Sequence, residues 1–188
     1  MIGDWITAPR EMLRCALHDH SEETLHFNFN QSNAMNDQPN LAQQLEEIEH
    51  RMALKQLVDT FSILADRKET QQQTLLFTED GMSETYVNGQ LVSSLRGRQQ
   101  LAEAFGGFLS KFDAVYHLNG QQTVTLTGDT ATGTSYCQVT LIGPEDGRQL
   151  KTTIGAYYED EFVRQSGQWL IARRKATFAW QDKQVLGQ

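Results

Sequence analysis

The sequence has few cysteines, no long apolar run and no excess of basic residues. It contains only two cysteines, Cys15 and Cys137, which form no metal-ligand spacing, so we interpret both as reduced thiols of a cytoplasmic protein. No apolar run approaches the length needed to span a bilayer, which excludes a membrane protein. The formal net charge of −8 argues against a nucleic-acid partner, because phosphate binding needs a basic stripe and the basic clusters here are short.

The overall composition is that of a soluble globular protein, with 39% hydrophobic and 21% charged residues among 188. Residues 1–40 show no sustained period of two or 3.6, so we predict a poorly ordered or loosely docked extension there. The main domain is predicted over residues 41–182. His18, His20 and His26 lie in the extension, and we interpret them as solvated because a metal site needs a fixed frame.

Apolar residues recur at helical spacing over residues 41–65, which predicts one long amphipathic helix. Asn40 or Asp37 is placed to cap its start. Asp66 follows the last apolar turn, where the helix dipole disfavours a carboxylate unless a cation lies nearby. The two basic residues that follow could supply that cation.

A short helix, a hairpin and a third helix are predicted next. Residues 70–77 favour the short helix, which the turn T-E-D-G closes. The hairpin is indicated by Asn88-Gly89, the strongest two-residue turn signal. Apolar residues recur at helical spacing over residues 101–112 and form a face wide enough to lie on a sheet.

The rest of the chain favours four long antiparallel strands, over residues 114–127, 130–142, 149–164 and 168–181. They are divided by G-D, G-P-E-D-G-R and Q-S-G, all of which are typical of hairpins. Helices first and sequential hairpins afterwards predict an α+β fold with the helices on one face. Long strands twist, so we expect the sheet to wrap around the helices and leave a pocket at its open end.

His117 lies in the first of these strands, where a histidine can be core filler, an edge residue or a proton carrier. Strict alternation would place His117 on the opposite face from Val124 and Leu126. A bulge at Asn119-Gly120 would bring all three to one face, and glycine in a strand often marks a bulge. We therefore predict that bulge.

The order of motifs resembles the SnoaL-like group of the nuclear transport factor 2 superfamily. The motifs are A-D-R, F-T-E-D-G, L-R-G-R-Q-Q-L, Y-H-L-N, G-D-T-A-T-G, Y-Y-E-D-E-F-V-R-Q-S-G-Q-W and I-A-R-R, and the resemblance covers residues 41–180. It implies a cone-shaped, cystatin-like α+β barrel in which a curved, mixed sheet wraps around the N-terminal helices. The superfamily hosts both enzymes and non-enzymes, so the fold alone does not settle the function.

Within that group the sequence is similar to lyases such as scytalone dehydratase, bile acid 7α-dehydratase and hexachlorocyclohexane dehydrochlorinase. Asp66 and His117 match an aspartate and a histidine that these enzymes share. The resemblance implies that His117 is a general base that removes a proton from carbon, while Asp66 fixes its tautomer and stabilises the imidazolium. Arg174, in I-A-R-R, matches an arginine that in several of these enzymes faces the pocket and could stabilise a leaving group or an oxyanion.

Each of these residues also has a structural interpretation. Asp66 could be a helix-end carboxylate paired with a neighbouring cation, and His117 could be a core histidine bonded to a carbonyl. Arg174 could be a solvated strand residue beside two other basic residues, and this is the interpretation we favour for it.

The sequence departs from the dehydratase pattern at one informative place. Phe61 stands five residues before the aspartate, where some dehydratases carry a tyrosine. Tyr86 could supply a hydroxyl from the first hairpin, and Phe178 is most simply a core or interface residue. We name Arg174, Tyr86, Phe61 and Phe178 as candidate substrate-binding residues.

These features lead to one functional hypothesis and two alternatives. The hypothesis is a lyase or isomerase without cofactor or metal that acts on a small, largely apolar cyclic substrate. The first alternative is a non-catalytic domain for small-molecule binding or assembly. The second is the small subunit of a ring-hydroxylating dioxygenase. The resemblance also implies a homodimer or homotrimer, and we expect neither nucleic acid nor membrane as a partner.

Overall fold

The computed structural model describes residues 40–186, so the predicted extension and its three histidines lie outside the described residues. The elements are α1 (Leu41–Asp66), α2 (Thr70–Thr74), β1 (Phe77–Val87), β2 (Gln90–Arg96), α3 (Arg98–Leu109), β3 (Ala114–Thr127), β4 (Thr130–Glu145), β5 (Arg148–Gln165) and β6 (Gln168–Val185). Within this part of the chain, no helix is long and apolar enough to cross a membrane.

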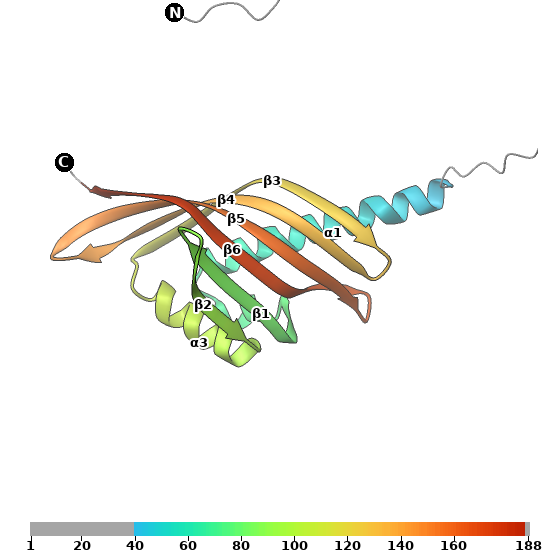
Figure 1. Cartoon of the computed structure of the whole chain (residues 1–188), viewed down its shortest axis with the longest axis horizontal. Coiled ribbons are helices and arrows are strands. Elements are labelled where there is room, and N and C mark those ends of the chain that lie inside the picture. The colour runs from blue at the N-terminus through green and yellow to red at the C-terminus, as the bar shows by residue number, and fades with distance from the viewer. Residues whose placement is uncertain (1–39, 187–188) are drawn as a thin grey trace, which may run out of the picture. The chain divides into compact units, whose positions relative to one another are not determined.

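The first helix, α1, begins at the predicted cap. The Asn40 side chain accepts a hydrogen bond from the Gln43 backbone N–H at 3.0 Å, and the Gln43 side chain accepts one from the Asn40 backbone at 2.9 Å. This reciprocal pair satisfies two donors that a helix start leaves unpaired. Only the second half of α1, from Leu54 onward, is buried. The first turns of α1 extend beyond the sheet (Figure 1).

The six strands form one sheet in the order β2-β1-β6-β5-β4-β3. Strand β1 runs parallel to β6, and every other neighbouring pair is antiparallel. The helices lie on one side of the long strands (Figure 1). Two groups of buried side chains fill the space between, one around Phe77 and Ile171 and the other around Val139 and Ile154. The observed architecture is the predicted α+β fold with a curved mixed sheet.

The region after α1 differs from the prediction in one respect. Helix α2 is shorter than expected, and T-E-D-G lies inside β1 instead of ending a helix. The reason is that Phe77 is fully buried and pairs with Ile171, which extends the strand backwards. The turn-like residues appear as an irregularity in the β1–β6 register between Phe77 and Met82. The hairpin turn at Asn88-Gly89 is present, with both residues at positive φ.

The predicted bulge in β3 is confirmed. Asn119 pairs with Cys137 and Gln122 pairs with Ser135, so two residues of β3 lie opposite the single residue Tyr136. The extra residue reverses the alternation along β3. As a result His117 lies on the same inward face as Val124 and Leu126, while its neighbours Tyr116 and Leu118 are exposed.

Candidate active site

Asp66 and His117 contact each other through two hydrogen bonds. Asp66 Oδ1 lies 2.6 Å from His117 Nδ1, and Asp66 Oδ2 accepts the His117 backbone N–H at 3.3 Å. Asp66 is the last residue of α1, and His117 lies in β3 ahead of the bulge. One carboxylate therefore fixes both the ring and the backbone of the same residue.

The contact with Asp66 determines which nitrogen of His117 carries the proton. A carboxylate can only accept, so the hydrogen bond places the N–H at Nδ1 and leaves a lone pair on Nε2. Within residues 40–186, Nε2 has no hydrogen-bond partner. The His117 side chain is 8% exposed and that of Asp66 is 24% exposed. In its neutral form, this largely buried imidazole has a free lone pair on Nε2 and is suited to accept a proton.

The basic residues after α1 do not neutralise Asp66. Lys68 donates to the Phe112 carbonyl at 2.5 Å, and no ion pair joins Asp66 to Arg67 or Lys68 in the described part of the chain. The alternative interpretation, in which Asp66 pairs with a neighbouring cation, is therefore wrong in this structure.

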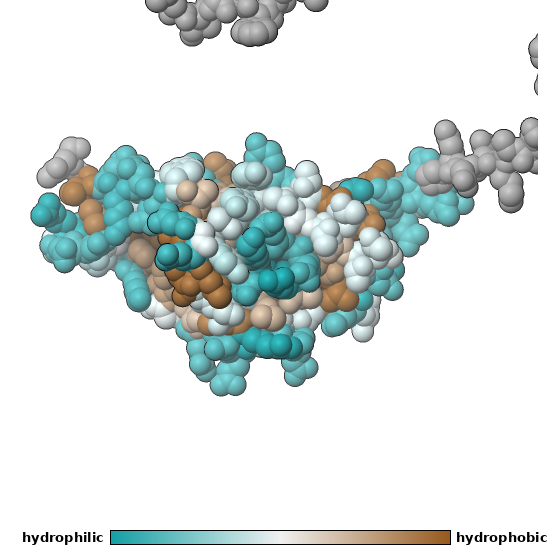
Figure 2. Space-filling view, viewed as in Figure 1, coloured by the Kyte–Doolittle hydropathy of each residue, from teal (hydrophilic) through white to brown (hydrophobic). Residues whose placement is uncertain are grey.

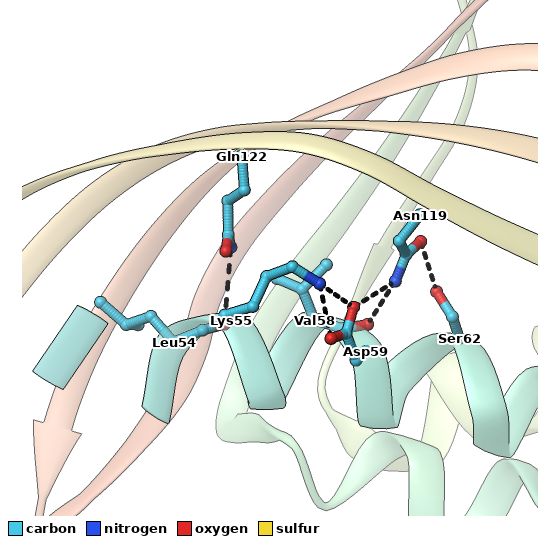
Figure 3. A network of polar contacts seen from close by, with 7 residues as sticks. All are labelled: Leu54, Lys55, Val58, Asp59, Ser62, Asn119 and Gln122. Atoms are coloured by element: carbon cyan, nitrogen blue, oxygen red, sulfur yellow. Dashed lines mark hydrogen bonds and ion pairs between the residues drawn. The ribbon is translucent and has the colours of Figure 1, made fainter. Parts of the chain in front are cut away.

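A polar network joins α1 to the bulge of β3 (Figure 3). Ser62 Oγ donates to Asn119 Oδ1 at 3.0 Å, and Asn119 Nδ2 donates to Asp59 Oδ1 at 2.9 Å. Lys55 Nζ lies 2.5 Å from both carboxylate oxygens of Asp59. Asn119 is two residues beyond His117, and Ser62 is one helical turn before Asp66. The network thus holds together the two segments that carry the pair.

His117 lines a cavity of about 340 Å³ between the sheet and the helices. This volume is within the range of small-molecule sites. Most of the wall is apolar and includes Phe61, Ala65, Leu95, Phe105, Leu109 and Phe178. The polar wall residues include Gln73, Ser83, Thr85, Tyr158 and Arg174.

The cavity reaches the surface between β2 and α3. Val92 of β2 and Phe108 of α3 line it and are also exposed. Hydrophobic side chains gather over β2 on the face shown in Figure 2. Leu91 and Val92 of this strand are both exposed. An apolar rim of this kind suits the entry of an apolar molecule.

Arg174 is buried, which corrects the prediction of a solvated strand residue. Its side chain donates to both oxygens of Asp160, from Nε at 2.8 Å and from Nη2 at 2.7 Å. The guanidinium lies between the rings of Phe61 and Tyr158, at 4.3 and 4.4 Å from their centroids. Burial opposes its charge, but the Asp160 carboxylate outweighs this and raises the pKa of Arg174. It is therefore a permanent positive charge in the cavity wall.

The other candidate residues are divided between the two faces of the sheet. Phe61 and Phe178 line the cavity with His117. Tyr86 does not, because side chains alternate along β1: Thr85 and Val87 line the cavity, while Tyr86 borders a depression outside it with Lys175 over its ring. The assignment of Tyr86 to the pocket is therefore wrong.

Sequence reasoning missed three residues of the site, Gln73, Tyr158 and Asp160. Tyr158 and Asp160 alternate with outward-facing residues in Y-Y-E-D-E-F, so their parity was an available signal. An inward-facing aspartate requires a buried cation, which would have pointed to Arg174. No comparable pattern indicated Gln73.

The fold and the site together define a cone-shaped α+β protein of the cystatin-like kind with a histidine–carboxylate pair in an apolar cavity. The chain belongs to the SnoaL-like domain family, whose model matches residues 46–175. The match includes Asp66, His117 and Arg174. The predicted resemblance is therefore confirmed at the level of the family.

Individual known proteins are similar to this chain at identities below 30%. An uncharacterized protein of Mycobacterium tuberculosis is 28% identical over 136 residues, which is 72% of this chain and 89% of the relative. The crystal structure of a nuclear transport factor 2-like protein with a cystatin-like fold from Novosphingobium aromaticivorans is 26% identical, with a TM-score of 0.58, and covers 77% of this chain and 92% of that one.

Two further structures share the fold. A scytalone dehydratase-like protein of Novosphingobium aromaticivorans has a TM-score of 0.64 at 18% identity, covering 74% of this chain and 89% of that one. A hexachlorocyclohexane dehydrochlorinase from Novosphingobium barchaimii has a TM-score of 0.65 at 16% identity, and the match covers 77% of this chain and 96% of that one. The neighbours of this SnoaL-like fold thus include proteins of the lyase type.

Proposed function

We propose that the protein is a cofactor-independent lyase or isomerase that removes a proton from carbon in a small, largely apolar cyclic substrate. The observation that carries the proposal is the 2.6 Å contact between Asp66 and His117 Nδ1, with Nε2 unpaired, in the wall of an apolar cavity. The lyase-type neighbours of the fold support the same class of reaction.

In this mechanism His117 Nε2 takes the proton, and the electron pair of the C–H bond moves into the substrate. Asp66 stabilises the imidazolium that forms, because its carboxylate already accepts from Nδ1. In a lyase the electron pair forms a double bond as a leaving group departs with its own pair. In an isomerase His117 returns the proton to another carbon. No external oxidant or reductant is required in either case.

Arg174 supplies the positive charge for this chemistry. Negative charge develops on the leaving group or on a conjugated oxygen as the proton is removed. Arg174 is fixed by Asp160 and by two aromatic rings, so it does not have to reorganise during the reaction. The apolar wall lowers the local dielectric constant, which strengthens the interaction of this charge with the substrate.

Exchange of carbon-bound hydrogen in D₂O tests proton removal directly and can be measured on simple cyclic compounds. A panel of one-ring and two-ring ketones and hydroxyketones is incubated with the protein, and exchange next to the carbonyl is followed by NMR. We expect exchange with the unmodified protein and a loss of about 10²–10⁴-fold in His117→Ala and Asp66→Asn. Tyr86→Phe is the matched control, because Tyr86 lies outside the cavity. Undiminished exchange in either variant of the pair would disprove the proposed base.

A further inference from the structure

The end of α1 closes with a turn in which Lys68 occupies a position that favours glycine. The Lys68 backbone N–H donates to the Ala65 carbonyl at 2.9 Å, and the Glu69 backbone N–H donates to the Leu64 carbonyl at 2.9 Å. These two bonds form a Schellman motif, in which the first residue beyond the helix cap adopts the left-handed conformation and is usually glycine. Lys68 adopts this conformation, with a φ of 57°. A lysine therefore lies where its own backbone is unfavourable.

Lys68 differs from the other residues that have a positive φ without being glycine. Within residues 40–186 these are Asn88, Asp146 and Ser166, and each is the first residue of a hairpin turn that a glycine completes. Such turns require a positive φ, and short polar side chains suit them. Lys68 lies in no hairpin, and its side chain makes no bond to its own turn. Because an unfavourable conformation without a local reason indicates a role, the side chain of Lys68 deserves a functional interpretation.

The Lys68 side chain reaches the segment that leads into β3. Its ammonium group donates to the Phe112 carbonyl at 2.5 Å, and a charged donor makes this a strong class of hydrogen bond. Lys68 comes two residues after Asp66, and Phe112 comes five residues before His117. The bond therefore links the two stretches of backbone that carry Asp66 and His117.

The segment that contains Phe112 is itself anchored to β4. The backbone N–H of Asp113 donates to the Ile142 carbonyl at 2.7 Å. A Cβ added at Gly143 would lie only 3.0 Å from the Phe112 Cα, so the two backbones approach more closely than a side chain allows. The carbonyl that Lys68 contacts is therefore held by the sheet, and the ammonium ties the end of α1 to a fixed point.

We infer that Lys68 is a positioning residue for the proposed reaction, because its ammonium group sets how the end of α1 meets β3. A glycine at this position would favour the turn but lose the tie, which explains why a lysine occupies it. The role in the reaction rests on the proposed function. The effect on the contact between Asp66 and His117 does not, since the state of the imidazole is measured without turnover.

Lys68→Met and Lys68→Gly separate the side chain from the backbone. Both remove the ammonium group, but only glycine suits the left-handed conformation, so Lys68→Gly should unfold at a higher urea concentration than Lys68→Met. We expect the ¹⁵N signals of the His117 ring and its Nδ1 proton signal to shift in both variants. The exchange of carbon-bound hydrogen in the ketone panel should fall about tenfold in both. If Lys68→Gly instead kept the signals and the rate of the unmodified protein, the turn alone would matter and the inference would be overturned.

Lys111→Met is the matched control, because it removes a lysine directly before Phe112. The Lys111 side chain makes no hydrogen bond or ion pair within residues 40–186, so the ring signals and the rate should not change. Ring signals that shift only in the two Lys68 variants support the tie even if no ketone exchanges, in which case only the proposed function fails. Unmoved ring signals in Lys68→Met, or equal shifts in Lys111→Met, would overturn the tie. Shifted signals with an undiminished exchange rate would overturn the role in the reaction.

Discussion

Asp160 and Arg174 face each other across β5 and β6 and form a buried, bidentate ion pair. The pair is not a surface contact, since the two side chains are 1% and 2% exposed. Removing one partner would leave a charge in an apolar wall with nothing to balance it. We predict that Arg174→Met lowers the free energy of unfolding by about 3–5 kcal/mol, measured by urea denaturation.

Arg173→Met is the control for this prediction, because it removes a neighbouring arginine whose side chain is 43% exposed. Solvent screens the contacts of Arg173 with Glu84 and Glu161, so we expect the free energy of unfolding to fall by about 1 kcal/mol or less. The double change Asp160→Asn with Arg174→Met should recover part of the stability, since neither charge is left alone. Equal losses in the two arginine variants would show that burial does not distinguish them.

Asn119 is predicted to position His117 and Asp66, the pair proposed to be catalytic. It joins the bulge of β3 to Ser62 and Asp59 of α1, so Asn119→Ala should loosen the contact between His117 and Asp66 (Figure 3). We expect the exchange rate of carbon-bound hydrogen in the ketone panel to fall about tenfold to a hundredfold, because small misplacements of reacting groups commonly slow a reaction by that much. The ¹⁵N shifts of the His117 ring should move as well.

Gln122→Ala is the matched variant, because Gln122 makes a weaker contact, 3.5 Å long, with the Leu54 carbonyl of the same helix. It should leave the ring signals and the exchange rate near their original values. If Asn119→Ala lowers the free energy of unfolding but leaves the imidazole signals unchanged, the network is structural and does not position the pair.

Most helices and strands could be predicted from the sequence because their signals are local. The burial of Arg174 could not be predicted, because its ion-pair partner depends on the register of β5 and β6. Simple hairpin pairing around Gln165 and Gln168 would place Asp160 opposite Arg173. The register shifts by one residue between Glu161 and Phe162, which brings Arg174 opposite Asp160 instead. The bulge in β3 was predictable, since a glycine marked it and the parity of His117 required it. No such marker accompanies the shift in β6.

We propose that the outer face of the sheet forms a homodimer or homotrimer interface. Tyr116, Leu118, Tyr136 and Trp180 are exposed there, on the side away from the helices. A cluster of exposed large apolar side chains is typical of an interaction surface. We predict a mass of two or three chains by light scattering, and a shift toward one chain in Leu118→Glu. Leu75→Glu, at an exposed site outside this face, should not change the mass, and a monomeric unmodified protein would refute the proposal.

Cys137 is predicted to be unreactive in the folded protein. It is 4% exposed, and burial raises the pKa of its thiol to about 11 from the usual 9.0. Because the fold favours the protonated thiol, this group stabilises the fold fully below about pH 9, and the contribution is lost as the pH rises through about 11. In Cys15→Ser, Cys137 is the only cysteine left, so a thiol reagent at about pH 8 should label the protein only after urea is added. Rapid labelling of the native variant would show that the thiol is accessible and readily ionised.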